Sequence, residues 1–205
     1  MNLPKILIKI STVMTAVLAG FALFPALPFS FISEGSIQSE PVLNIKNAGT
    51  PSKQEQVSFG LPLHLRIPKI NVDAAIERVG LTPEGAMDIS ESLDDVAWYK
   101  NGPRPGENGS AVIAGHYGER SGKIAVFNDL YKLSKGDQLS IKDSKGVIIS
   151  FVVRKIKIYD PNADASDVFF SSDRRSHLNL VTCAGVWNED SKTFSNRLVV
   201  FTDKK

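Results

Sequence analysis

The sequence predicts an all-β domain, either a barrel or a sandwich, that follows a charge-free N-terminal segment. From Leu61 onward, apolar residues occur in many short runs that are separated by turn residues. Several of these runs alternate apolar and polar residues with the period of a half-buried strand. Only Lys123–Lys132 has apolar residues at helical spacing, which predicts one or two short helices at most.

The N-terminal segment has the length and charge pattern of a membrane anchor. No charged residue occurs between Ile10 and Ile32, and Lys5 and Lys9 precede this run. At about 1.5 Å per residue, a helix of this length spans the roughly 30 Å hydrocarbon core of a bilayer. Lysines before the run predict a cytoplasmic N-terminus and an exported body. A cleaved signal peptide is the alternative, although the run has no clean cleavage site.

The charge balance argues against a nucleic-acid partner. The chain has 24 Lys and Arg residues and 22 Asp and Glu residues, for a net charge of +2. Lys5 and Lys9 account for the whole excess, so the body from Ser33 onward is neutral. A basic DNA- or RNA-binding surface would need a surplus of cations there. The chain also has one cysteine, which excludes an intramolecular disulfide and metal sites built from cysteine pairs.

Composition divides the chain into three parts. Residues 1–32 form the cytoplasmic tip and the anchor or signal peptide. Residues 33–60 are rich in Ser, Gln, Glu, Asn and Pro without a lasting period, which predicts a flexible spacer. Residues 61–205 carry the strand-like runs and are expected to be the exported, folded domain.

The strand predictions follow the apolar runs in chain order. They are Leu63–Ile67, Ala74–Val79, Ala111–Ala114, Gln138–Lys142, Val147–Tyr159, Leu178–Cys183 and Arg197–Thr202. The turn residues Asp143–Gly146 predict a hairpin between the fourth and fifth runs. Within Val147–Tyr159 the apolar residues change face, which indicates a bulge of the kind that a closing barrel needs.

Cys183 is a candidate nucleophile because it ends a predicted strand before a small-residue turn. Alternation places Leu178, Leu180 and Thr182 on one face of that strand and Asn179, Val181 and Cys183 on the other. Free cysteines are usually buried and inert, and this alternative stays open at the level of the residue alone. Outside the cell, however, an unpaired thiol is a liability that usually has a function.

A cysteine nucleophile needs a proton partner and a group that stabilises charge on the attacked carbonyl. Of the three histidines, His116 ends the run Ala111–Gly115 at a strand-to-loop junction, where functional residues are common. His64 and His177 are expected to be solvent-exposed. Arg197 begins the last predicted strand and is the candidate for charge stabilisation.

Two other patterns carry no chemistry. The aspartates within Asp160–Asp167 do not have the spacing of a calcium loop and are expected to be solvated. The glycines of Gly102–Gly109 lack the spacing and the following lysine of a phosphate-binding loop. No metal or cofactor site is therefore predicted.

Together these residues resemble the sortases, which are cysteine transpeptidases of the Gram-positive cell surface. The order of motifs is that of the family: a histidine ends Val112–His116, a cysteine ends Leu178–Cys183, and an arginine opens the strand in Asn196–Val200. The family signature Thr-Leu-x-Thr-Cys retains Leu180, Thr182 and Cys183, whereas its first threonine is replaced by Asn179.

The resemblance covers nearly all of residues 61–205. It continues through Leu65–Ile70, Trp98-Tyr99, Gly102–Gly106 and Phe127–Leu130. The segment Gly-Pro-Arg-Pro-Gly is similar to one found in the group often called class F.

The resemblance implies an eight-stranded sortase-type closed barrel and a specific reaction. Cys183 would attack the threonine carbonyl of an LPxTG-like C-terminal sorting signal of a secreted protein and form a thioester. His116 would give a proton to the released glycine amine, and Arg197 would hydrogen-bond the substrate carbonyl. A second amine, from a peptidoglycan cross-bridge, a lipid precursor or a pilin lysine, would resolve the thioester. No cofactor is implied.

Thr182 and Trp187 are secondary candidates for substrate binding. Thr182 precedes the nucleophile and would help to position substrate, or else pack as an ordinary strand residue. Trp187 follows Cys183 and would line the groove, or else serve packing alone.

Two other functions stay open: a membrane-tethered, non-catalytic domain that binds the cell wall, and a different extracellular cysteine peptidase. A nearby imidazolium or guanidinium group is expected to favour the Cys183 thiolate.

Overall fold

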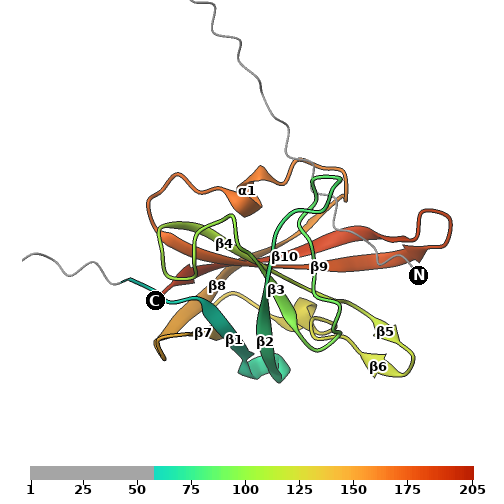
Figure 1. Cartoon of the computed structure of the whole chain (residues 1–205). Helices are drawn as coiled ribbons and strands as arrows, with labels where there is room; N and C mark the ends of the chain where they lie inside the picture. The colour runs from blue at the N-terminus through green and yellow to red at the C-terminus, as the bar shows by residue number, and fades with distance from the viewer. Residues whose placement is uncertain (1–57) are drawn as a thin grey trace, which may run out of the picture. The chain divides into compact units, whose positions relative to one another are not determined.

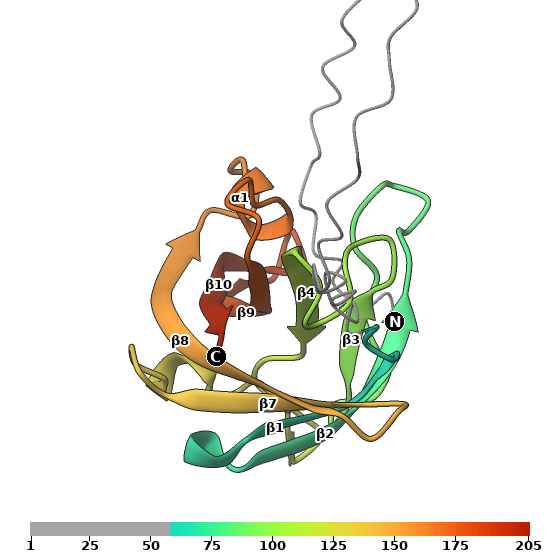
Figure 2. The same ribbon diagram turned by 90° about the vertical axis from the view of Figure 1, so that its left-hand side faces the viewer.

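The computed structural model describes residues 58–205, which form a closed eight-stranded barrel (Figures 1 and 2). Around the barrel the strand order is β1-β2-β3-β4-β9-β10-β8-β7. The strands are β1 (Pro62–Ile67), β2 (Val72–Val79), β3 (Val96–Tyr99), β4 (Gly109–Gly115), β7 (Gln138–Asp143), β8 (Ile148–Tyr159), β9 (Ser176–Asn188) and β10 (Thr193–Lys204). A separate two-stranded ribbon consists of β5 (Glu119–Arg120) and β6 (Lys123–Ile124). The predicted eight-stranded closed barrel is therefore confirmed.

The strands pair in antiparallel fashion except at two places. β2 runs parallel to β3, and β4 runs parallel to β9. The second parallel pair matters for function, because it brings the C-terminal end of β4 beside a point within β9. That point is followed by a long hairpin in which β9 and β10 extend beyond the end of β4.

The barrel interior is filled by one apolar face of each strand, as the alternation predicted. The buried residues of this core include Leu65, Ile67, Ile113, Phe127, Phe151, Leu178, Leu180 and Val200. At about 25 cal/mol per Å² of apolar surface buried, this core is the main source of stability for the domain.

The opposite face of β4, β9 and β10 carries a second cluster outside the barrel. Val112, Val181 and Val199 belong to it, and α1 (Ser166–Phe169) covers it through Val168 and Phe169. Figure 2 shows α1 over this part of the sheet. Because Cys183 is two residues after Val181, the predicted face assignment puts it at the end of this covered outer face.

The change of face predicted within the long run of β8 is a β-bulge at Arg154. Phe201 of β10 pairs with Lys155, whereas Thr202 pairs with Val153, so Arg154 has no partner in the ladder. Before the bulge Phe151 and Val153 point into the barrel, and after it Ile156 packs against the same core. The extra residue thus restores an apolar residue to the interior as the strand bends around the barrel.

The predicted helix at Lys123–Lys132 is wrong. Lys123 and Ile124 belong to β6, and only η2 (Leu130–Lys132) is helical, as a 3₁₀ turn. The amide groups of the intervening residues donate to distant carbonyls: Ala125 to Gly118, Val126 to Leu93, and Phe127 to His116. These long-range hydrogen bonds replace the i→i−4 bonds of a helix, so the helical spacing reflects tertiary packing.

Four short elements were not predicted from sequence. They are β3, β5, α1 and the 3₁₀ helix η1 (Pro68–Ile70). Each has two to four residues, which is too short for a period to be recognised.

The N-terminal edge of the described chain packs onto the barrel. Phe59, which falls within the predicted spacer, is buried in the core, and its carbonyl accepts a hydrogen bond of 2.9 Å from Arg104 Nη1. The Gly102–Gly106 turn thus ties this edge to the domain, since Trp98 Nε1 also donates to the Pro103 carbonyl. The predicted anchor, residues 10–32, lies outside the described residues. Within residues 58–205 no helix is both long and apolar enough to cross a bilayer.

Candidate active site

Cys183 and Arg197 face each other across the β9–β10 ladder. They are direct partners in the register, near the point where both strands leave the barrel for the projecting hairpin. Directly opposed residues of an antiparallel pair point to the same face. The Arg197 side chain therefore shares the outer face with the Cys183 thiol, and its charge acts on that thiol.

His116 lies at the end of β4, beside Cys183 on the adjacent parallel strand. Ala114 pairs with Val181, and the hydroxyl of Thr182 donates a 2.8 Å hydrogen bond to the carbonyl of Gly115. One residue further along, His116 and Cys183 follow these paired residues on strands that are roughly 5 Å apart. The topology thus brings together the three predicted site residues, which are separated by up to 81 positions in the chain.

The half-buried imidazole of His116 is held from the side opposite to solvent by a backbone carbonyl. Its Nε2 lies 2.8 Å from the carbonyl oxygen of Ser90, in the connection between β2 and β3. Burial lowers the pKa of His116 below its ordinary value, the Ser90 hydrogen bond offsets part of this, and the charge of Arg120 lowers it further. At neutral pH the imidazole is therefore predominantly neutral.

The thiol of Cys183 is also predominantly neutral. Burial raises its pKa above the ordinary value, and the nearby Arg197 guanidinium only partly offsets this effect. The expectation that a nearby cation favours the thiolate is confirmed for Arg197, whose charge lowers the pKa of Cys183, but desolvation is the larger effect. The thiolate, which is the reactive form of a cysteine, is therefore a minor species at neutral pH.

Arg197 is 4% exposed and is held by its own hairpin. Nη1 donates to the carbonyls of Phe194 and Asn196 at 3.0 and 2.9 Å, and Nη2 donates to the Thr193 hydroxyl at 3.0 Å. The Nε–H group is buried and has no acceptor among the described residues. Since buried donors are nearly always paired in folded proteins, this unpaired donor is a feature of Arg197 that the contacts of its own hairpin do not explain.

The two secondary candidates have different positions. Thr182 is fully buried on the inner face, and its hydroxyl is committed to Gly115, so it supports the site from within the barrel. Trp187 lies in the projecting hairpin, where its ring packs against Phe194 at 5.1 Å, and Phe194 in turn packs against Tyr117 at 5.3 Å. This aromatic group links the hairpin to the residue that follows His116.

The other two histidines lie away from the site. His64 is about half exposed and pairs with Asp73 at 2.7 Å, as an ordinary surface residue. The expectation that His177 is exposed is wrong: it is 2% exposed and lies between Asp203 and Asp173, at 2.8 and 2.9 Å. It is the second residue of β9, whereas Cys183 lies six residues further along that strand.

Ser90, Thr193 and Asn179 contribute to the site and were not recognised in these roles. Ser90 contacts His116 from the β2–β3 connection, whose course no local pattern predicts, whereas Thr193 contacts Arg197 from four residues earlier in β10. Asn179 is 1% exposed, and its amide donates a 2.6 Å hydrogen bond to the Val168 carbonyl. The departure from the family signature at this position therefore has a structural role: it ties α1 to the outer face of β9. The only sequence signal of this role was that asparagine replaces the threonine of the family signature at position 179.

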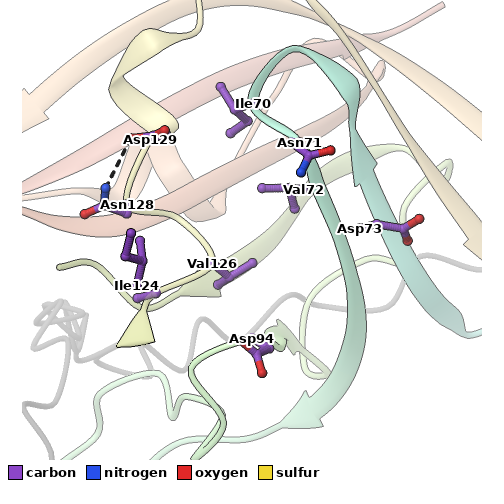
Figure 3. Close-up of a pocket in the computed structure, with 10 residues that line it drawn as sticks. Ile70, Asn71, Val72, Asp73, Asp94, Ile124, Val126, Asn128 and Asp129 are labelled. Carbon is purple, nitrogen blue, oxygen red and sulfur yellow. Dashed lines mark hydrogen bonds between the residues drawn. The ribbon is translucent and has the colours of Figure 1, made fainter. Parts of the chain in front are cut away.

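A separate cavity of about 370 Å³ lies between the β1–β2 turn and residues 124–129 (Figure 3). It does not include His116, Cys183 or Arg197. Its lining contains three carboxylates, and each is already in an ion pair: Asp73 with His64, Asp94 with Lys123, and Asp129 with Lys132. We therefore assign the chemistry to the β4–β9–β10 site.

Comparison with solved structures finds the same fold in sortases. Sortase C1 of Streptococcus agalactiae, in complex with MTSET, matches with a TM-score of 0.55 and 26% identity over 71% of this chain and 69% of that one. Sortase C-1 of Actinomyces oris matches with a TM-score of 0.55 and 24% identity over 69% and 72%. A sortase D5 transpeptidase of Clostridium perfringens matches with a TM-score of 0.51 and 26% identity over 71% and 79%.

Sequence comparison agrees with this likeness. No curated protein matches the chain at a significant level. The family model of the sortase domain, however, matches residues 65–205, which is well over half of the chain. This chain therefore belongs to the sortase family.

Proposed function

We propose that this sortase is a membrane-anchored cysteine transpeptidase that cleaves an LPxTG-like sorting signal between threonine and glycine. One observation carries the proposal: β4, β9 and β10 place His116, Cys183 and Arg197 together, with Arg197 directly opposite Cys183. A nucleophile, a proton carrier and a buried donor at one sheet end are the requirements of acyl transfer through a thioester.

In the first half-reaction, His116 takes the proton of the Cys183 thiol, and the sulfur attacks the threonine carbonyl carbon. Arg197 Nε–H donates to the oxygen on which negative charge develops. When the intermediate collapses, the carbon–nitrogen bond breaks, and the His116 imidazolium gives its proton to the departing glycine amine. The products are a thioester between Cys183 and the amino-terminal part of the substrate, and a released carboxyl-terminal peptide that begins with glycine and has a free amine.

In the second half-reaction, an acceptor amine attacks the thioester carbonyl. The carbon–sulfur bond breaks, the amine proton passes to His116, and a new amide forms while the Cys183 thiolate is regenerated. The thioester conserves acyl energy, so transfer to an amine needs no further energy source. The acceptor is an amine of the cell surface, such as a peptidoglycan cross-bridge, a lipid precursor or a pilin lysine.

The membrane location rests on the N-terminal sequence. The run from Ile10 to Ile32 follows Lys5 and Lys9, the pattern of a single-pass anchor with a cytoplasmic N-terminus and an extracellular catalytic domain. An anchored site would meet secreted substrates as they leave the membrane.

The reaction is tested with the full-length chain in detergent micelles. A library of LPxTG-like peptides is incubated with several amines, and products are identified by mass spectrometry. We expect cleavage between threonine and glycine, an amide with one of the amines, and an acyl adduct on Cys183. Cys183→Ser keeps the shape of the site and should abolish both products. Transfer that survives in Cys183→Ser would refute the mechanism; rapid wall binding without any turnover would favour a non-catalytic binding domain.

The location is tested separately. Membrane fractions of expressing cells should contain the chain at its full-length mass, and external protease should digest the catalytic domain of intact protoplasts. A shortened, secreted form would show instead that the segment is a cleaved signal peptide.

A further inference from the structure

The Ser90–Asp94 segment, in the connection between β2 and β3, is attached at three points to the segment that runs from His116 to Val126. The Ser90 carbonyl accepts from His116 Nε2, the Leu93 carbonyl accepts from the Val126 amide, and Asp94 pairs with Lys123. Figure 3 shows Asp94 and Val126 on these neighbouring segments. The segment is therefore part of the wall behind the imidazole.

Ser90 is the best-anchored residue of this segment. It is 2% exposed, and its hydroxyl donates a 2.9 Å hydrogen bond to Glu77 Oε1 on β2. The same hydroxyl accepts a 3.0 Å hydrogen bond from the amide of Ser92. The Ser90 hydroxyl thus bonds both to Glu77 on β2 and to the Ser92 amide. These bonds hold Ser90 in the orientation in which its backbone carbonyl contacts His116.

The chemistry of this contact determines which nitrogen of His116 holds a proton. A carbonyl oxygen only accepts hydrogen bonds, so the 2.8 Å contact requires a proton on Nε2. This is true of the neutral imidazole and of the imidazolium alike. The second ring nitrogen, Nδ1, is then the one that gains and loses a proton.

We propose that Ser90, anchored by Glu77, is a positioning residue that keeps the His116 proton on Nε2, so that Nδ1 exchanges protons with the thiol and the leaving amine. The role in turnover rests on the proposed function, whereas the state of the ring does not. Besides the Ser90 carbonyl, the groups that bear on His116 are Arg120, whose charge acts on it, and Cys183 on the adjacent strand. Glu77 acts only through Ser90.

The ring state is tested by NMR on the full-length chain in micelles with ¹⁵N-labelled histidine. The chain has three histidines, so His116 is assigned by its loss in His116→Gln. We expect the neutral ring to carry hydrogen on Nε2 and Nδ1 to show the shift of an unprotonated nitrogen. A wild-type ring with its hydrogen on Nδ1 would overturn the proposal, whether or not the protein turns over peptides.

The anchoring role is tested by a matched pair at one position. Glu77→Gln keeps an oxygen acceptor for the Ser90 hydroxyl, whereas Glu77→Ala removes it; Glu77 is exposed, so both should fold. We expect Glu77→Ala to mix the two neutral forms of His116 and to lower kcat for peptide transfer about 10-fold, the scale seen when a partner that orients a histidine is lost. Glu77→Gln should stay near wild type, and KM should change little in both.

Two further variants separate positioning from general damage. Ser90→Ala removes the anchored hydroxyl itself and should reproduce Glu77→Ala. Glu91→Ala, on the neighbouring exposed residue, should leave the His116 spectrum and kcat unchanged. If Glu77→Ala and Ser90→Ala fold but keep both the Nε2–H ring and the wild-type kcat, Ser90 is not a positioning residue.

Discussion

The Thr182 hydroxyl donates a 2.8 Å hydrogen bond to the carbonyl of Gly115, which joins the residue before Cys183 to the residue before His116. Both residues are buried on the inner face of the barrel. This buried contact therefore helps to fix the spacing between Cys183 and His116.

Replacing Thr182 with valine should loosen this junction. Thr182→Val keeps the branched shape and leaves the Gly115 carbonyl buried without a donor, at a cost of about 1–3 kcal/mol in the free energy of unfolding. Chemical denaturation measures this cost, and peptide turnover should fall with it. Thr182→Ser, which retains the hydroxyl, is the control and should preserve more of the turnover. Equal losses in both variants would show that the methyl group, and not the hydrogen bond, is what matters.

Arg197 should be intolerant of lysine. A lysine keeps the positive charge but has no Nε–H at the position beside Cys183 and cannot reach the three acceptors of the hairpin at once. We expect Arg197→Lys to lower kcat/KM by about 10²-fold or more, the usual effect of losing a donor to a developing oxyanion. Thr193→Val removes only one of the three anchors and should have a smaller effect. If Arg197→Lys retained wild-type kcat/KM, the guanidinium would be serving as a point charge alone.

The pH dependence of turnover should be a broad bell. The His116 pKa lies below its ordinary value and the Cys183 pKa lies above its ordinary value, both chiefly because of burial. The midpoint of the acid limb of kcat/KM should therefore lie below about pH 6.5, and the midpoint of the alkaline limb should lie above about pH 8.5. Alkylation of Cys183, the one cysteine of the chain, measures the thiol directly, with His116→Gln as the control. A thiol that alkylates fully at pH 6 would contradict the desolvation argument.

His177 should matter for stability and not for turnover. It is the second residue of β9, about 20 Å along the strand from Cys183, and it holds Asp173 and Asp203. The hydrogen bond from His177 holds the pKa of Asp173 well below its usual range. A lowered carboxyl pKa stabilises the fold above about pH 4, and this contribution is lost as the pH falls. His177→Gln should therefore lower the melting temperature near neutral pH, and its difference in melting temperature from the wild type should become smaller in acid. The value of kcat should stay unchanged at temperatures where the variant is folded.

Most of the barrel was predictable because its strands are long enough to show a period. The alternation in Leu178–Cys183 assigned each residue to the correct face, and the change of face in Val147–Tyr159 predicted the bulge at Arg154. The helix predicted over Lys123–Lys132 failed for the converse reason. Of its apolar residues Phe127 and Leu130 are buried in the core whereas Ile124 and Tyr131 are exposed, and the amides of 125–127 donate to distant carbonyls, so the spacing imitates a helix without the hydrogen bonds of one.

Local patterns in the chain were sufficient to predict the β-domain, its single thiol, and the ordered histidine, cysteine and arginine that resemble the sortases. His116 directly follows β4, but Cys183 and Arg197 lie within β9 and β10, so the strand ends predicted at these two residues are wrong: both strands continue into the projecting hairpin. The order of the three residues was nevertheless recognised from their neighbours in the chain. The contacts of those residues could not be read in this way. Ser90 meets His116, and Asn179 meets the Val168 carbonyl, only when the chain folds. Thr193 lies four residues before Arg197 in β10, so its contact depends on the local course of that strand. The opposite signs of the His116 and Cys183 pKa shifts were equally hidden, because they arise from burial, and burial is a property of the assembled fold.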